Sequence, residues 1–141
     1  MNIRFLGAAR TVTGSCYLLT LPGVKAVVDC GLVQGGGDAR DRNREPFGFD
    51  PKEIDLLFLT HAHLDHAAGA GVLAEQCPQA TVLAHPRAAR HLVDPARLEA
   101  SARKVYGDGP FEILYGSRLL SIPASRVRSL ADNDEVVLGN S

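Results

Sequence analysis

Three histidines and one aspartate fall within residues 61–66, and these side-chain types suit metal coordination. Neutral imidazole and carboxylate groups are ligands that zinc accepts, at about 2.0–2.2 Å. In an extended backbone His61 and His63 lie on one side of the chain. Asp65 and His66 follow where the chain begins to turn, so they can point elsewhere. The spacing therefore predicts one ion held by His61 and His63, and a second ion held by Asp65 and His66.

Such a pair of ions indicates hydrolytic chemistry. Two ions about 3.5–4 Å apart can generate a hydroxide and clamp a phosphoryl or carbonyl oxygen. The alternative interpretation is a surface turn that is rich in histidine and binds no metal. The ligand spacing and the strand-to-helix setting favour the metal. His85 and His91 have no partner at ligand spacing, so we interpret each as a packed or helix-capping residue.

The segments on either side of this stretch would place it at the edge of a sheet. Residues 54–59 are nearly all apolar, which predicts a strand buried on both faces in a sheet covered by helices. Residues 67–75 can open a helix, with glycines near its start. In open α/β sheets, ligands bind at the ends of such strands. The histidines are therefore expected on a strand-to-helix turn.

The rest of the chain predicts a mixed sheet with several helices. A Pro-Gly pair at 22–23 predicts a type II turn, and therefore a hairpin, between two N-terminal strands. The second strand of this hairpin ends at Asp29, which points to the sheet edge of the histidines if the strands are neighbours. A short apolar segment is expected at 111–115. Strands are expected at 2–6 (half-buried), 15–20, 25–29, 80–84 and 126–130, with a hairpin partner at 135–138, and helices at 67–76, 87–93 and 96–106.

Residues 30–51 predict a long irregular segment. Arg40, Arg42 and Arg44 alternate there with acidic residues. The three arginines could meet an anionic substrate, but interspersed acids are typical of a plain solvated surface. We favour the solvated surface.

Size and composition predict one domain without membrane contact. The chain has 141 residues, of which 45% are hydrophobic. Its net charge of −1 gives no basic excess, so nucleic acid is not expected to bind this chain alone. The sequence has no membrane-spanning apolar run and no signal-peptide pattern at its start. Cys16, Cys30 and Cys77 are widely spaced and predict reduced thiols in a cytoplasmic protein, with Cys16 and Cys30 as packing residues.

The motif at 61–66 resembles the principal metal motif of the metallo-β-lactamase superfamily, and the residues before it resemble its β-CASP ribonucleases. The resemblance is dense over residues 1–66. Residues 80–139 resemble other, hydrolase-like branches of the superfamily. The change suggests a chimera of two members, with a seam within 67–80. The matching pieces, in the family order, are Leu6-Gly7-Ala8-Ala9-Arg10, Val12-Thr13-Gly14-Ser15-Cys16, Asp29-Cys30-Gly31, Gln34-Gly35 and Pro46-Phe47-Gly48-Phe49-Asp50-Pro51.

This resemblance implies a fold, a cofactor and roles for the site residues. The fold class is α/β (α+β): residues 1–141 would form one half of an αββα sandwich, a mixed sheet with helices on one face. The cofactor would be zinc, as one or two ions, with His61, His63, Asp65 and His66 as ligands and Asp65 as the catalytic residue. Asp29 would orient a ligating histidine through a hydrogen bond; the alternative is a simple turn aspartate. The family's third histidine, bridging aspartate and last histidine have no counterpart here.

Two functions of different kinds follow from this resemblance. The leading one is a zinc-binding hydrolase half-domain, in which a metal-bound hydroxide attacks an RNA-like phosphodiester, or an ester or lactam, if the site is completed. The alternative is a catalytically inactive half-domain that self-associates. A third, an RNA-binding fragment, is disfavoured by the near-neutral charge. Because Val27, Leu57, Leu59 and Val82 would leave a sheet face too apolar for water, we also predict a two-fold homodimer.

Overall fold

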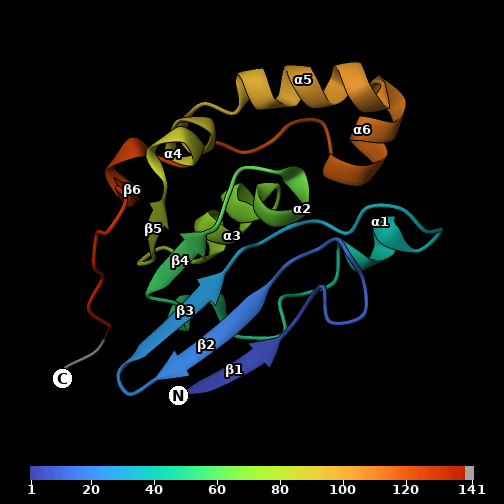
Figure 1. Cartoon of the computed structure of the whole chain (residues 1–141). Helices are drawn as coiled ribbons and strands as arrows, with labels where there is room; N and C mark the ends of the chain where they lie inside the picture. Colours follow the sequence, from blue (N-terminus) through green and yellow to red (C-terminus); the bar gives the residue numbers. More distant parts are fainter. Residues whose placement is uncertain (139–141) are drawn as a thin grey trace.

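A mixed β-sheet carries the helices of this protein (Figure 1), and the computed structural model describes residues 1–138. Neighbouring strands from β1 to β3 are antiparallel, and those from β3 to β6 are parallel. This mixed sheet confirms the predicted fold class. The six strands lie side by side in chain order: β1 (Asn2–Phe5), β2 (Tyr17–Leu21), β3 (Val24–Val28), β4 (Leu56–Leu59), β5 (Thr81–Ala84) and β6 (Val127–Ser129).

One face of the sheet is covered by helices. The main core joins Leu73 of α3 and Leu92 of α4 to Val27, Leu57 and Val82 of the central strands. Within residues 1–138, no helix is both long and apolar enough to cross a lipid bilayer. The helices are α1 (Ala39–Arg42), α2 (Leu64–Ala67), α3 (Ala70–Gln76), α4 (Pro86–Val93), α5 (Ala96–Tyr106) and α6 (Asp108–Tyr115), with 3₁₀ turns η1 (Pro51–Glu53) and η2 (Ala124–Arg126).

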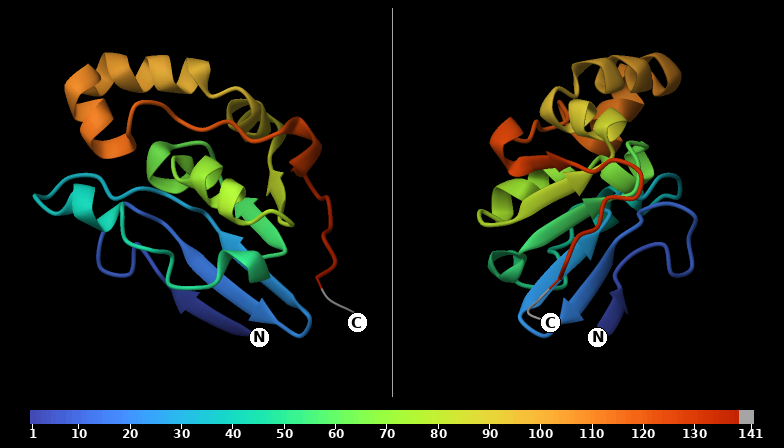
Figure 2. Two further views of the ribbon diagram at one scale, coloured as in Figure 1. Left: turned by 180° about the vertical axis from the view of Figure 1, so that it is seen from behind. Right: turned by 60° about the vertical axis from the view of Figure 1, so that its left-hand side comes forward.

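A second, smaller core joins α5 and α6 to α2. Its buried residues include Leu64 of α2, Ala102 of α5, and Phe111 and Tyr115 of α6. Figure 2 shows α5 and α6 as an outer layer, farther from the sheet than α2 and α3. The layer bears on the site because α2 carries two of the predicted metal ligands.

Strand β4 is buried on one face only, so the prediction of burial on both faces is wrong. Leu57 and Leu59 point into the core, whereas Leu56 and Phe58 are half-buried. The helices pack on one side of the sheet, and alternate residues of a strand point to opposite sides.

The four residues expected on an uncovered face lie instead in the core. Val27, Leu57, Leu59 and Val82 are each at most 5% exposed, because α3 and α4 cover them. The opposite face contains a row of paired residues that runs from Phe5 through Tyr17 and Val28 to Phe58. Strand β1 is exposed along its whole length rather than half-buried.

Two segments after residue 107 differ from the prediction. The expected apolar segment at 111–115 belongs to α6, which begins at Asp108 and accommodates Pro110 in its first turn, where a missing N–H costs little. The expected hairpin partner at 135–138 forms no strand, although the turn before it is present. There the Asp134 amide N–H donates to the Ala131 carbonyl at 3.1 Å.

The predicted seam at 67–80 lies inside one continuous core. Buried residues before it, such as Leu57, and after it, such as Leu92, belong to the same cluster. The Arg126 guanidinium also donates to the carbonyl oxygens of Ala74 at 2.6 Å and Ala80 at 2.8 Å, which ties η2 to this region. The chimeric origin stays a prediction.

The two-fold homodimer also stays a prediction. Its interface would lie on the sheet face that the helices leave open, because the residues first expected there are in the core. We expect sedimentation velocity at micromolar concentration to show a dimer. Phe5 is 63% exposed on this face, so Phe5→Asp should shift the population to monomer by placing a charge in an apolar contact. Val105→Asp, at a residue 78% exposed on α5, is the matched control. A monomeric unchanged chain would contradict the prediction.

Candidate metal centre

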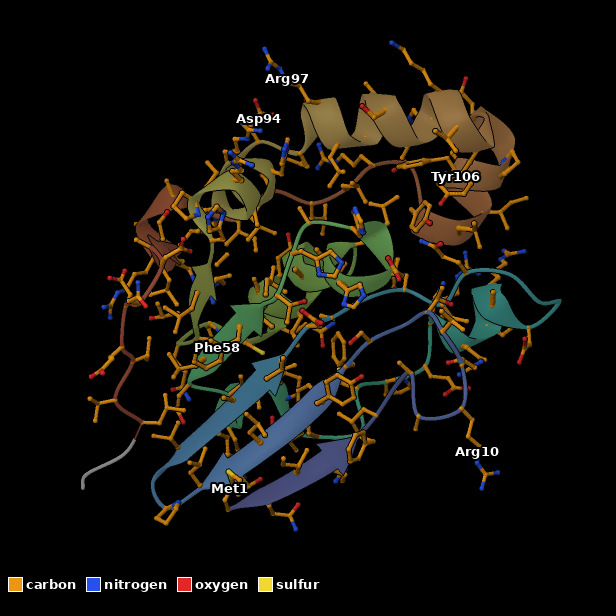
Figure 3. The ribbon with its side chains drawn as sticks, viewed as in Figure 1. Met1, Arg10, Phe58, Asp94, Arg97 and Tyr106 are labelled. Carbon is orange, nitrogen blue, oxygen red and sulfur yellow. The ribbon has the colours of Figure 1, made fainter. Side chains whose placement is uncertain are left out.

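The ends of β3 and β4 meet because these strands are parallel neighbours. Val28 pairs with Phe58, and the amide N–H of Asp29 donates to the Phe58 carbonyl oxygen at 2.8 Å. Figure 3 labels Phe58 on the strand that leads into the histidine loop. Asp29 has a φ of 58°, in the left-handed region that aspartate tolerates better than most residues. The backbone turns there, and its carboxylate lies against Thr60.

The Asp29 carboxylate is 2% exposed and receives hydrogen bonds from three residues. The Thr60 amide N–H donates to Oδ1 at 2.9 Å, and the Thr60 hydroxyl lies 2.9 Å from Oδ1 and 3.0 Å from Oδ2. The Ser15 hydroxyl donates to Oδ2 at 3.1 Å. His66 Nδ1 lies 2.7 Å from the same oxygen. A buried carboxylate with this many donors is a fixed support for its neighbours.

The Asp29 carboxylate determines which ring nitrogen of neutral His66 is protonated. A carboxylate only accepts hydrogen bonds, so His66 Nδ1 is the donor of the 2.7 Å contact. In the neutral imidazole the other nitrogen, Nε2, then has a free lone pair. That is the form of histidine that coordinates a metal through Nε2.

Thr60 connects the Asp29 carboxylate to His61 and so also fixes the tautomer of the His61 ring. The Thr60 hydroxyl has one proton, and the Asp29 carboxylate can only accept it. His61 Nδ1, 2.9 Å from Thr60 Oγ1, is therefore the donor to that oxygen. His61 then also presents an unprotonated Nε2. One buried carboxylate thus sets the tautomers of two imidazoles, directly for His66 and through a hydroxyl for His61.

Backbone hydrogen bonds hold α2, which carries Asp65 and His66. The Ser15 amide N–H donates to the Asp65 carbonyl at 3.0 Å, and the Cys30 amide N–H donates to the His66 carbonyl at 2.8 Å. A Cβ at Gly31 would lie 1.6 Å from the Asp65 carbonyl oxygen, so only glycine fits there. Ser15, Cys30 and Gly31, which precede the histidine motif and belong to the segments that resemble the superfamily, therefore contact the motif itself.

The three imidazoles form one cluster rather than two separated groups. The ring centroid of His61 is 3.9 Å from that of His66 and 4.7 Å from that of His63. Asp65 Oδ2 lies 3.5 Å from His66 Nε2. His61 thus has His63 beside it and His66 has Asp65 beside it, and the two groups adjoin each other; the division into two ions stays a prediction. The Asp29 hydrogen bond holds the His66 ring beside His61.

The cluster favours neutral imidazole at His61. Burial, followed by the neighbouring imidazoles of His66 and His63, lowers the pKa of His61 below its ordinary value. A neutral ring is the form that can donate a lone pair to a metal.

The donor set fits a metal chemically but does not enclose one. Among residues 1–138, no three His, Cys, Asp or Glu side chains form a group that could hold one ion. His61 and His66 nevertheless present Nε2, and the Asp65 carboxylate lies beside His66; imidazole and carboxylate are the ligands that zinc accepts. A metal here would need further ligands from outside this cluster.

The other candidate ligands have separate roles. His85 caps α4, because its Nδ1 accepts a hydrogen bond from the Arg87 amide N–H at 3.2 Å, and this confirms the capping interpretation. Cys30 is buried and Cys16 is half-buried. Burial, and after it the charge of Asp29, raises the pKa of the Cys16 thiol to about 11, so that thiol stays protonated and is a poor ligand.

Sequence reasoning missed Thr60 and Ser15 as partners of Asp29. A usable signal was present for Thr60: it directly follows a strand, as Asp29 does, and residues after neighbouring parallel strands meet at one edge. Ser15 gave no comparable signal, because its contact depends on where the β1–β2 connection folds.

The fold and this site geometry agree with the comparison to known families. The sequence model of the metallo-β-lactamase superfamily matches residues 9–139, and the chain belongs to this superfamily. An archaeal superfamily member from Sulfolobus tokodaii has the same fold, with a TM-score of 0.67 over 90% of this chain and 46% of its own, at 24% identity. A B3 metallo-β-lactamase with an active-site glutamic acid matches 98% of this chain and 46% of its own, at 27% identity and a TM-score of 0.60.

The N-terminal resemblance to β-CASP ribonucleases is confirmed as well. Ribonuclease TTHA0252 from Thermus thermophilus is 58% identical over 66 residues, which are 47% of this chain and 15% of that protein. Cleavage and polyadenylation specificity factor 73 from Drosophila melanogaster is 41% identical over 70 residues, 47% of this chain and 10% of its own length. The chain thus spans a small part of these curated relatives.

The carboxylate network predicts how zinc affinity responds to two substitutions. Asp29→Asn should weaken zinc binding by about 10–100-fold, because the amide no longer fixes His66. Thr60→Val should weaken it less, because only His61 loses its orienting partner. Thr81→Val, at a half-buried threonine of β5, is the control. Calorimetric zinc titrations give the affinities, and far-UV circular dichroism verifies folding; an unchanged affinity in Asp29→Asn would favour the turn aspartate.

Proposed function

We propose that this chain contributes a zinc-binding cluster to a metallo-β-lactamase-type hydrolase site. The observation that supports it best is the Asp29 network, which leaves Nε2 unprotonated on both His61 and His66. A surface turn without a metal site would not require a buried carboxylate, such as that of Asp29, that accepts several hydrogen bonds. We assign His61, His63, Asp65 and His66 as ligands, with Asp29 as the residue that positions them.

The residues of the cluster have different tasks in this proposal, and His63 is a further zinc ligand beside His61. A bound zinc ion would supply Lewis-acid activation of water and of the scissile group. His61 and His66 offer lone pairs in fixed orientations, and Asp29 holds the proton of His66 at Nδ1. Asp65, whose Oδ2 lies 3.5 Å from His66 Nε2, is placed to bind the ion or accept a proton, and we assign it to catalysis. One or two ions are consistent with this donor set.

The proposed substrate is a phosphodiester of an RNA-like molecule, or an ester or lactam. Relatives named as a ribonuclease and as a cleavage and polyadenylation specificity factor support the phosphodiester. A structural neighbour named as a metallo-β-lactamase supports the ester or lactam. The net charge of −1 supplies no general attraction for RNA, so we expect binding of RNA by this chain alone to be weak. The three free cysteines support a cytoplasmic location.

A catalytically inactive, self-associating domain is the second candidate. It is favoured by the exposed apolar residues of β1, where Ile3 is 47% and Phe5 is 63% exposed. Hydrolysis assays with added zinc, on chain of known oligomeric state, separate the two functions. Turnover of an RNA phosphodiester, or of an ester or lactam, supports the hydrolase. Zinc binding without turnover of any of them supports the inactive domain.

Zinc uptake tests the ligands themselves. His61→Ala with His63→Ala should remove most zinc at neutral pH, because two of the proposed donors are lost. His85→Ala with His91→Ala is the matched control, since both residues belong to or cap α4, outside the cluster. Zinc per chain is measured by elemental analysis after gel filtration. Equal loss in the two double variants would overturn the assignment.

A further inference from the structure

A cavity of about 650 Å³ lies between α1, α3 and the end of α6. Among the described residues that line it, none belongs to the histidine cluster or is Asp65. α1 and α6 contact each other at one end of the molecule (Figures 1 and 2). The volume falls in the range of small-molecule sites, about 300–1,000 Å³.

Much of the cavity lining is apolar and comes from segments far apart in the chain. Phe47 and Phe49 lie in the segment between α1 and β4, and their rings stack with centroids 5.5 Å apart. Val72 of α3, Leu114 of α6 and Leu120 add aliphatic surface. Such a lining can bury the apolar body of a ligand.

The charged residues of the lining are mainly cationic. Among the described residues, Arg40, Arg42, Arg44 and Arg118 line the cavity, against one carboxylate, that of Glu45. Within residues 1–138, these five side chains make no ion pair or hydrogen bond with the protein. Guanidinium groups bind carboxylate and phosphate oxygens in a bidentate manner.

Two of the acids that alternate with these arginines in sequence do not line the cavity. Asp38 and Asp41 are absent from the lining, whereas Glu45 is part of it. Arg40 and Arg44 are exposed, which agrees with the predicted solvated surface. The same surface forms one side of the cavity, where Arg118 from beyond α6 joins the three arginines.

Tyr115 contributes a polar group to the cavity wall. Its side chain lines the cavity and is 8% exposed, and its buried hydroxyl makes no hydrogen bond of standard geometry within the described residues. Burial, followed by the neighbouring Tyr106, raises the pKa of this hydroxyl above its ordinary value, and the side chain of Gln34 also lies within its reach. Buried polar groups in proteins are nearly always well paired. An oxygen of a bound anion would compete with Tyr106 and Gln34 for this hydroxyl.

We propose that this cavity binds a small amphipathic anion, with an apolar body and one carboxylate or phosphate head group. The apolar body packs on Phe47, Phe49 and Leu114, and the head group meets the arginines and the Tyr115 hydroxyl. This site is separate from the proposed zinc cluster, and it does not require zinc.

Calorimetry with decanoate, decyl phosphate and decanol tests the proposal on the full chain. Decanoate or decyl phosphate should bind, and whichever binds tighter identifies the head group. Decanol should bind at least about 10-fold more weakly, because it has no charge for the arginines. Binding of decanol as tight as that of both anions, or no binding of either anion, would overturn the proposal.

Three variants place the ligand in this cavity. Arg118→Gln and Tyr115→Phe should each weaken the anion by about 5- to 10-fold. Val72→Phe should weaken it by at least about 10-fold by placing a ring against the apolar part of the cavity, and Val72 is 42% exposed, so the larger ring is tolerated. The amide signals of Gly69 and Gly116, which line the cavity, should shift on binding in the unchanged chain.

Matched controls come from α5. Arg97, which points outward in Figure 3, and Val105 do not line the cavity. Arg97→Gln and Val105→Phe should leave the affinity within twofold. Equal losses in the control and cavity variants would show that the anion binds elsewhere, for example on the open sheet face, and would overturn the assignment.

Discussion

The buried carboxylate of Asp29 is the group on which the rest of the site depends. It accepts hydrogen bonds from Ser15, Thr60 and His66, which come from the β1–β2 connection, the end of β4 and α2. The parallel pairing of β3 with β4 brings Asp29 and Thr60 to one edge of the sheet, and the antiparallel pairing of β2 with β3 brings the segment before β2 to the same edge. Loss of the carboxylate would leave three sets of donors without an acceptor, so its removal affects both packing and imidazole orientation.

The contacts of this carboxylate require two backbone positions that most residues cannot occupy without strain or a clash. Asp29 itself has a φ of 58°, and Gly31 lies where any Cβ would meet the Asp65 carbonyl. Such positions persist where the surrounding structure fixes them, and they are often found at functional sites. The close contact at Gly31 lets α2 approach the end of β3, so that His66 reaches Asp29.

Local patterns predicted the six strands of the sheet and the helices α4 and α5, and long-range contacts account for much of what they missed. The helix expected at 67–76 is divided into α2, which begins at Leu64, and α3, and α6 was not predicted as a helix. The helix at Ala96–Tyr106 was predicted with its observed bounds, because its end is marked by Gly107, which has a φ of 83°. Asp29 was placed at the right edge because parallel strands end together. The orientation of His66, the role of Thr60 and the cavity of arginines depend on contacts between segments distant in sequence. The strand expected at 135–138 failed because a turn signal does not show whether a sheet edge will accept another strand.

The tautomers of His61 and His66 test the account most directly. Two-bond proton–nitrogen correlation spectra of the histidine rings, recorded on the metal-free chain above pH 7.5, report which nitrogen is protonated. The Asp29 network predicts a protonated Nδ1 and an unprotonated Nε2 on both rings, and loss of this pattern at His66 in Asp29→Asn. A protonated Nε2 on either ring of the unchanged chain would contradict the account.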